Sequence, residues 1–89
     1  PAREVELAAE ICDLAGGVDV LRQRALSRLA EGKLALAAHL IEQALRTSPA
    51  DAAVRKAYQQ IYTARAEAET SLMARGIFRA AVRKVESGT

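Results

Sequence analysis

The sequence has 89 residues, of which 51% are hydrophobic, and its formal net charge at pH 7 is +2. A chain of this length forms one small domain with a modest core, and so small a net charge does not call for nucleic acid as the partner. Alanine dominates the apolar residues, and β-branched residues never alternate as they do in strands. We therefore expect a single all-α domain over residues 1–89.

The first predicted helix covers about residues 3–14. Apolar residues recur along it at spacings of three and four, as at Val5, Ala8 and Cys12, which is the pattern of an amphipathic helix. Gly16 and Gly17 follow. We expect this pair to end the helix, because glycine adopts the left-handed conformation of a helix C-terminus without steric cost.

Two further helices are predicted before the middle of the chain. One spans about residues 18–31, with Asp19 as its N-cap or first-turn acid, and ends at Gly32. The next spans about residues 33–46 and ends before Pro49, because proline cannot continue a helix and restricts the residue that precedes it.

The remainder of the chain has few signals that end helices. Between residues 52 and 86 there is no proline, and Gly76 is the only glycine. We predict a helix that starts near Asp51, a turn at 64–67, and a fifth helix over 68–86. One long helix is the alternative.

The spacing from Gly32 to Pro49 is typical of tetratricopeptide-like helix pairs, in which glycine closes the turn and proline ends the second helix. The residues between them match the bulky and small positions of such a pair: Leu34, Ala37, Ile41, Ala44 and Leu45. The pattern does not repeat, because Ala66 stands where the next unit would have its glycine. A general peptide-binding array is therefore the weaker interpretation, and we expect four to five antiparallel helices in tetratricopeptide-like hairpins.

Nearly the whole chain resembles the dimerisation domain of alkyl sulfatases of the metallo-β-lactamase superfamily. The features that carry the resemblance are Gly16-Gly17, Gly32, Ala37-Ala38, Pro49, the stretch 53–55, and Glu67 or Glu69 before the last helix. Lys33 and Leu34 replace the Asp and the aromatic residue that are usual after the turn glycine, which indicates a divergent branch of that family.

The resemblance implies a non-catalytic dimerisation domain. We expect the chain, which begins at Pro1, to be a fragment of a longer hydrolase, with a second copy and the parent catalytic domain as its partners. The parent would hydrolyse sulfate esters of alkyl chains, or a related ester, with two zinc ions and water. The resemblance places the zinc ligands outside these residues, and we expect no cofactor, metal or catalytic residue within them.

Two side chains that often carry chemistry occur once each. A zinc site needs three or four ligands, and no ligand spacing surrounds His39 or Cys12. We expect His39 to be structural or to face solvent, and Cys12 to be a small buried hydrophobe. A lone cysteine forms no intrachain disulfide, which is compatible with a reducing compartment and slightly favours a cytoplasmic location. No apolar run reaches the length of a membrane span.

The last predicted helix has an apolar arc of roughly 200°, about twice what burial on one side requires. We predict that this arc contacts a second chain or the missing catalytic domain, although a groove between two neighbours of the same chain would also bury it. The candidate interface residues are Leu72, Met73, Ile77, Phe78 and Val82.

An adaptor that binds a peptide or protein partner is the alternative function. Its candidate contacts are Tyr58, Tyr62 and Arg65, together with the arginine stripe of Arg75, Arg79 and Arg83. The two tyrosines are expected to pack in or beside the core. The stripe is a solvated face, or it pairs with acids such as those of the first helix. Nucleic-acid binding is disfavoured, because no recognised motif and no stacking aromatics accompany the arginines.

Overall fold

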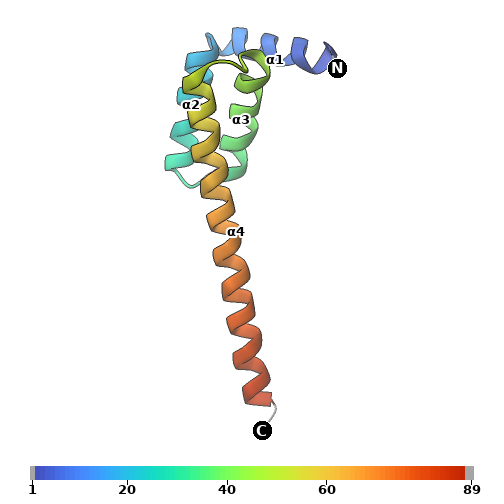
Figure 1. Cartoon of the computed structure of the whole chain (residues 1–89), viewed down its shortest axis with the longest axis vertical. Coiled ribbons are helices and arrows are strands. Elements are labelled where there is room, and N and C mark those ends of the chain that lie inside the picture. The colour runs from blue at the N-terminus through green and yellow to red at the C-terminus, as the bar shows by residue number, and fades with distance from the viewer. Residues whose placement is uncertain (1, 88–89) are drawn as a thin grey trace.

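The computed structural model describes the backbone of residues 2–87 and the side-chain surroundings of residues 3–73. Four helices and no strand occur in this part of the chain: α1 (Ala2–Ala15), α2 (Val18–Ala30), α3 (Leu34–Thr47) and α4 (Ala52–Ser87). Figure 1 shows α2, α3 and α4 running alternately down, up and down, with α1 across their upper end. The prediction of an all-α domain is confirmed.

The breaks between the first three helices lie where glycines were predicted to place them. Gly17 has a φ of 122° and donates its N–H to the Cys12 carbonyl at 2.8 Å. Gly32 has a φ of 80° and donates to the Leu29 carbonyl at 2.9 Å. Residues with a Cβ rarely adopt such angles, so these two glycines set the short turns that bring α1, α2 and α3 together.

The start of α4 is set by a side-chain cap. The Asp51 carboxylate accepts hydrogen bonds from the backbone N–H groups of Ala53 at 2.9 Å and Val54 at 3.2 Å. These groups are among the donors that the first turn of a helix leaves without a partner. The prediction of Asp51 as the residue that starts this helix is confirmed.

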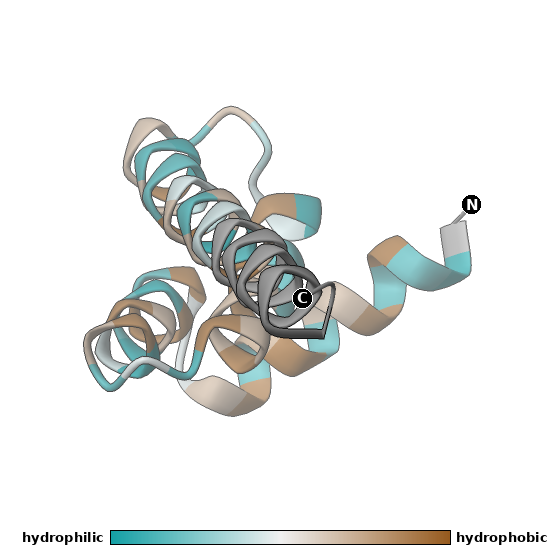
Figure 2. Ribbon diagram, turned by 90° about the horizontal axis from the view of Figure 1, so that it is seen from below, coloured by the Kyte–Doolittle hydropathy of each residue, from teal (hydrophilic) through white to brown (hydrophobic). Residues whose placement is uncertain are grey.

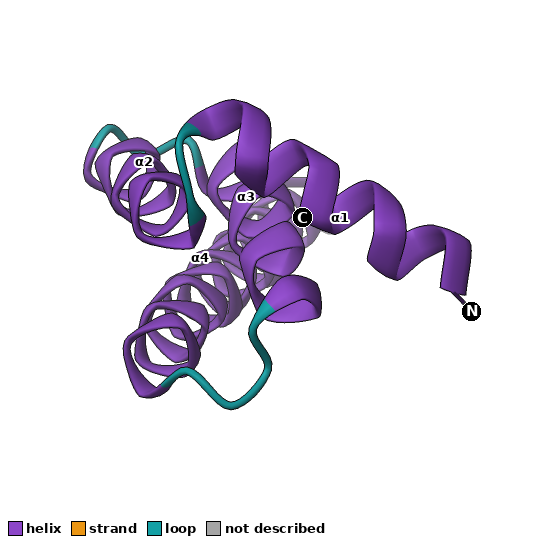
Figure 3. Ribbon diagram, turned by 90° about the horizontal axis from the view of Figure 1, so that it is seen from above, coloured by secondary structure: helices purple, strands orange, loops and turns teal. Residues whose placement is uncertain are grey.

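The core lies where α3 packs against each of the other three helices. Figure 3 shows α3 among them in the view from above. The buried cluster draws on all four helices and consists of Cys12, Leu21, Ala25, Ala37, Ala38, Ile41, Ala44, Val54, Ala57 and Ile61. Half of these residues are alanine, so the helix backbones approach closely and the core stays small.

The predicted turn at 64–67 is wrong. Residues 52–87 form one helix, which was the alternative. Alanine, arginine and glutamate fill residues 64–67, and neither glycine nor proline interrupts them, so nothing there competes with helix formation. Thr70 even adds a hydrogen bond from its Oγ1 to the Ala66 carbonyl at 2.9 Å. The first turns of α4 therefore lie in the core, and the helix continues without a turn that would fold its second half back onto the domain.

Candidate protein interface

The candidate interface lies on the part of α4 that extends beyond the body of the domain. Val54, Ala57 and Ile61 anchor the first turns of α4 in the core. From Glu69 to Met73 every residue is exposed. Figure 1 shows the ribbon continuing past the other helices to its C-terminal end. We call residues 69–87 the distal segment of α4. At a rise of 1.5 Å per residue this segment is roughly 28 Å long.

Two of the predicted interface residues can be assessed on this segment, and both are exposed. The exposed fraction is 64% for Leu72 and 68% for Met73. The other three, Ile77, Phe78 and Val82, lie in the helix but outside the residues whose side chains the structure describes. Extended apolar patches mark surfaces that bind another protein, and Leu72 and Met73 are the exposed apolar side chains that the structure describes on this segment.

A second apolar surface, which the sequence reasoning missed, lies on α1 to α3. Leu14 is 84% exposed, and Leu7 on the same helix is also exposed. Figure 2 shows several strongly hydrophobic residues along α1. Near its C-terminal end, Ala15, Val20, Leu21, Arg24 and Leu40 line a hollow of about 260 Å³. The heptad spacing from Leu7 to Leu14 could have indicated this surface, because it puts both on one face of α1.

The adaptor candidates on the first part of α4 do come together. The rings of Tyr58 and Tyr62 have centroids 4.3 Å apart at an angle of 31°. The Arg65 guanidinium carbon lies 5.4 Å from the Tyr62 centroid. Both tyrosines are half-buried beside the core cluster, so the prediction that they pack in or beside the core is confirmed.

The Tyr62 hydroxyl also ties α4 to α3. It donates a hydrogen bond to Oε1 of Glu42. This bond, with desolvation and the negative charge of Glu42, raises the pKa of Tyr62 from 10.0 to about 12. The phenol therefore keeps its proton to a higher pH than an unperturbed tyrosine does. Its contacts are those of a side chain that stabilises the packing of two helices.

The arginine stripe of Arg75, Arg79 and Arg83 lies in α4, outside the described side chains. The structure does show the exposure of the acidic side chains on α1 that could pair with such a stripe in another chain. Glu4, Glu6, Glu10 and Asp13 on α1 are all exposed. α1 and α4 have no contact with each other in the part of the chain that the structure describes.

His39 and Cys12, the single histidine and the single cysteine of the sequence, lie as predicted. His39 is exposed on α3. Cys12 is 2% exposed and sits in the core cluster, where its Sγ donates to Thr47 Oγ1 at 3.3 Å. Among the described residues, no group of three His, Cys, Asp or Glu side chains could hold a metal ion.

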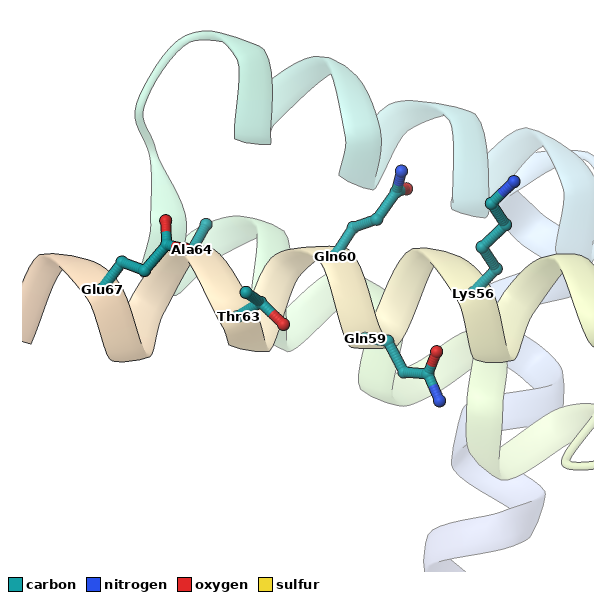
Figure 4. A pocket seen from close by; sticks show the side chains of 6 residues that line it. All are labelled: Lys56, Gln59, Gln60, Thr63, Ala64 and Glu67. Carbon is teal, nitrogen blue, oxygen red and sulfur yellow. The ribbon is translucent and has the colours of Figure 1, made fainter.

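A hollow of about 440 Å³, lined mostly by residues with polar side chains, runs along the first half of α4 (Figure 4). Its lining comes from that helix alone: Lys56, Gln59, Gln60, Thr63, Ala64 and Glu67. Small-molecule sites are concave and usually combine an apolar wall with a few convergent polar groups from several elements. Side chains along one helix do not enclose a ligand, so this hollow is an ordinary solvated face.

Comparison with known proteins adds one finding. A protein-family model described as alkyl sulfatase dimerisation matches residues 1–88. No curated protein and no solved structure matches the chain significantly. Among the described residues, no helix is both long enough and apolar enough to pass through a membrane. The family match covers all four helices, including the whole of α4.

Proposed function

The chain belongs to the alkyl sulfatase dimerisation family, and from this premise we propose that it joins two copies of a larger hydrolase through the distal segment of α4. A domain of this family is not catalytic by itself. Its contribution is the burial of apolar surface between two subunits, which is the main driving force of most protein association. Two identical chains joined through the same patch form a symmetric dimer.

The observation that carries the proposal is the exposure of Leu72 and Met73 on a helix that leaves the body of the domain. The described residues of α1, α2 and α3 leave both side chains open to solvent. The apolar residues Ile77, Phe78 and Val82 continue the same segment in the sequence. A second copy supplies the contacts that this chain does not.

We further propose that the parent is a zinc-dependent sulfuric ester hydrolase with a metallo-β-lactamase fold. The family name and the sequence resemblance support this. Zinc and the hydrolytic residues would belong to the catalytic domain, and this chain would hold two such domains in a constant relation. The presence of a metallo-β-lactamase motif of the HxHxDH type before Pro1 in the parent gene would test this part of the proposal.

The mass of the isolated chain in solution tests the dimer. Light scattering after size exclusion should give about twice 9.5 kDa over a range of concentrations. The double variant Ile77→Ala and Phe78→Ala should lower this mass while far-UV circular dichroism retains its helical signal. Leu14→Ala, at an exposed leucine of α1, is the matched control and should leave the mass unchanged.

Two results would contradict the proposal. A monomer at every concentration would show that this chain does not associate by itself, and the adaptor hypothesis with Tyr58, Tyr62 and Arg65 would then be preferred. A dimer that is unaffected by the double variant would place the interface elsewhere, with the exposed leucines of α1 as the next candidates.

A further inference from the structure

We propose that the distal segment of each copy docks on the body of the other, with Leu72 in the hollow between α2 and α3 of the partner subunit and Glu69 beside Arg24 of the partner subunit. This inference rests on the proposed function, because it names the surface that receives the distal segment. We call the receiving surface the α2–α3 hollow, after the two helices that supply most of its lining.

Leu72 points to the side of α4 that packs on the core. It follows Val54 by 18 residues, which is five full turns of an α-helix, so the two positions lie on the same face. Val54 is fully buried, whereas Leu72 is 64% exposed. Figure 1 shows the reason, because the distal segment continues past the ends of α2 and α3. The face of α4 that the other helices cover in the body is therefore left open at Leu72.

The α2–α3 hollow is apolar except for one arginine. α2 supplies Val20, Leu21 and Arg24 to its lining, and α3 supplies Leu40. Its volume is about 260 Å³, below the range of roughly 300–1,000 Å³ that is usual for small-molecule sites. Unlike the solvated face of α4, it has walls from more than one helix. A large apolar side chain of another chain is the occupant that suits this size and lining.

The charges beside the two surfaces are opposite. Arg24 and Glu69 are both exposed, and neither forms an ion pair with any of residues 3–73. Glu69 stands three residues before Leu72, and Arg24 stands four residues after Val20. At these spacings the side chains of a helix are neighbours. An acid beside an exposed leucine on one chain thus matches a base in an apolar hollow on the other, and the opposite charges steer the two together.

The direction of the two chains follows from where these surfaces lie. α2 and α4 both start at the upper end of the domain in Figure 1, and Val20 is in the first turn of α2. Leu72 lies about 30 Å along α4 from its start, at 1.5 Å per residue. In a two-fold pair each chain must offer its hollow to the Leu72 of the other. The chains therefore run in opposite directions, with each distal segment beside the body of the other chain.

The area that a stable dimer needs also favours docking on the body. Such dimers usually bury roughly 800 Å² on each chain. One side of a helix that is about 28 Å long and 10 Å wide offers only roughly 400 Å². Docking on the partner subunit adds a second surface on each chain, the α2–α3 hollow and its surroundings. A second copy of this chain is thus the occupant that both the charges and the area favour.

This contact adds to the one proposed for Ile77 and Phe78 and does not replace it. At 100° per residue, these two positions lie roughly 120–140° round α4 from Leu72. The distal segment is therefore buried on two sides, as the width of its apolar arc requires. Leu14 does not line the α2–α3 hollow, so it remains the control for the proposed function.

A charge in the hollow tests the docking. Val20→Asp should weaken the dimer about tenfold, because a carboxylate would be buried against Leu72 of the partner subunit. An acid in the first turn of a helix is favourable, so the fold should be retained. Ala53→Asp is the matched control, since it places the same acid at an exposed site in the first turn of α4. Light scattering on serial dilution gives the dissociation constants.

Charge exchange tests the position of Glu69. Arg24→Glu and Glu69→Arg should each weaken the dimer about tenfold, because each places like charges together twice. The two changes combined should restore the original dissociation constant. Glu67→Arg is the control: it makes the same charge change roughly 200° round the helix, and it should have a smaller effect.

The outcomes separate this inference from the proposed function. Weakening by Val20→Asp but not by Ala53→Asp, with rescue by the combined charge exchange, would support it. An unchanged dissociation constant in Val20→Asp, or no rescue, would overturn it, while the proposed function stands if the Ile77 and Phe78 double variant weakens the dimer. A chain that is monomeric before any substitution would contradict the proposed function and this inference with it.

Discussion

Alanine side chains decide how closely the helices of this domain approach one another. Ala8, Ala25, Ala37 and Ala44 have no exposed surface. Among residues 3–73, the large side chains that are fully buried are those of Ile41, Val54 and Ile61. A core of this kind packs densely but removes little apolar area from water, and small domains are correspondingly marginal. Burial of further apolar surface in a dimer would therefore matter to stability as well as to assembly.

The Tyr62 hydroxyl gives a prediction about pH. Its pKa is raised to about 12, mainly by the hydrogen bond to Glu42, so the folded chain holds this proton more tightly than the unfolded chain does. This contribution to stability is fully present below the unfolded pKa of about 10 and is lost as the pH rises through 12. Tyrosinate absorbance against pH, in a Tyr58→Phe background, should show the late titration.

Glu42→Gln should shift that titration of Tyr62 towards pH 10, because it removes the negative charge that opposes ionisation. Glu69→Gln makes the same change at an exposed site and should leave the curve in place. An unchanged titration in Glu42→Gln would show that the carboxylate is not the cause of the raised pKa.

At the level of the elements, α4 behaves as one continuous helix because its middle contains strong helix formers throughout. Ala66→Gly should lower the free energy of unfolding by about 1 kcal/mol, the usual cost of glycine in a helix interior. Urea unfolding followed by circular dichroism measures this change. If a turn occupied 64–67, glycine would be neutral or favourable there.

The matched control for this substitution is Ala50→Gly. Ala50 is exposed and lies in the turn before α4. Exposed turn positions tolerate glycine, so we expect a change within about 0.5 kcal/mol. A similar loss in both variants would mean that the effect of Ala66→Gly does not come from the helix.

At the level of the whole molecule, the shape is the main clue to assembly. The domain measures 61 × 27 × 20 Å, and its long dimension is that of α4 (Figure 1). A dimer through the distal segment links folding to concentration. Its Tm should rise by roughly 4 °C for each tenfold increase in protein concentration, given the usual unfolding enthalpy per residue.

Differential scanning calorimetry at several concentrations measures this dependence. Leu72→Glu should remove it, because a carboxylate would be buried at the contact. Leu14→Glu should retain it, since α1 lies outside the proposed interface. A Tm that does not depend on concentration in the unchanged chain would contradict a dimer whose formation is coupled to folding.

The amino-acid sequence by itself determined the fold class, the breaks between the first three helices, the start of α4 and the family. Gly17 and Gly32 required backbone angles that other residues avoid, and Asp51 supplied a local cap for α4. Such signals act between residues that are close in the chain, so they can be recognised without a structure. Features along nearly the whole chain, among them Gly16-Gly17, Gly32 and Pro49, also indicated the family whose model matches.

Only the tertiary structure decided which apolar residues of this chain are buried and which are free. The sequence around residues 64–67 did not distinguish a turn from a continuous helix. Helix propensity contributes little energy compared with tertiary packing, so it does not show whether a helix folds back on its neighbours. Leu14 and Leu21 are both leucines within helices, yet Leu14 is 84% exposed and Leu21 is 4% exposed. Burial depends on contacts between residues far apart in the chain, and these exist only once the helices have packed.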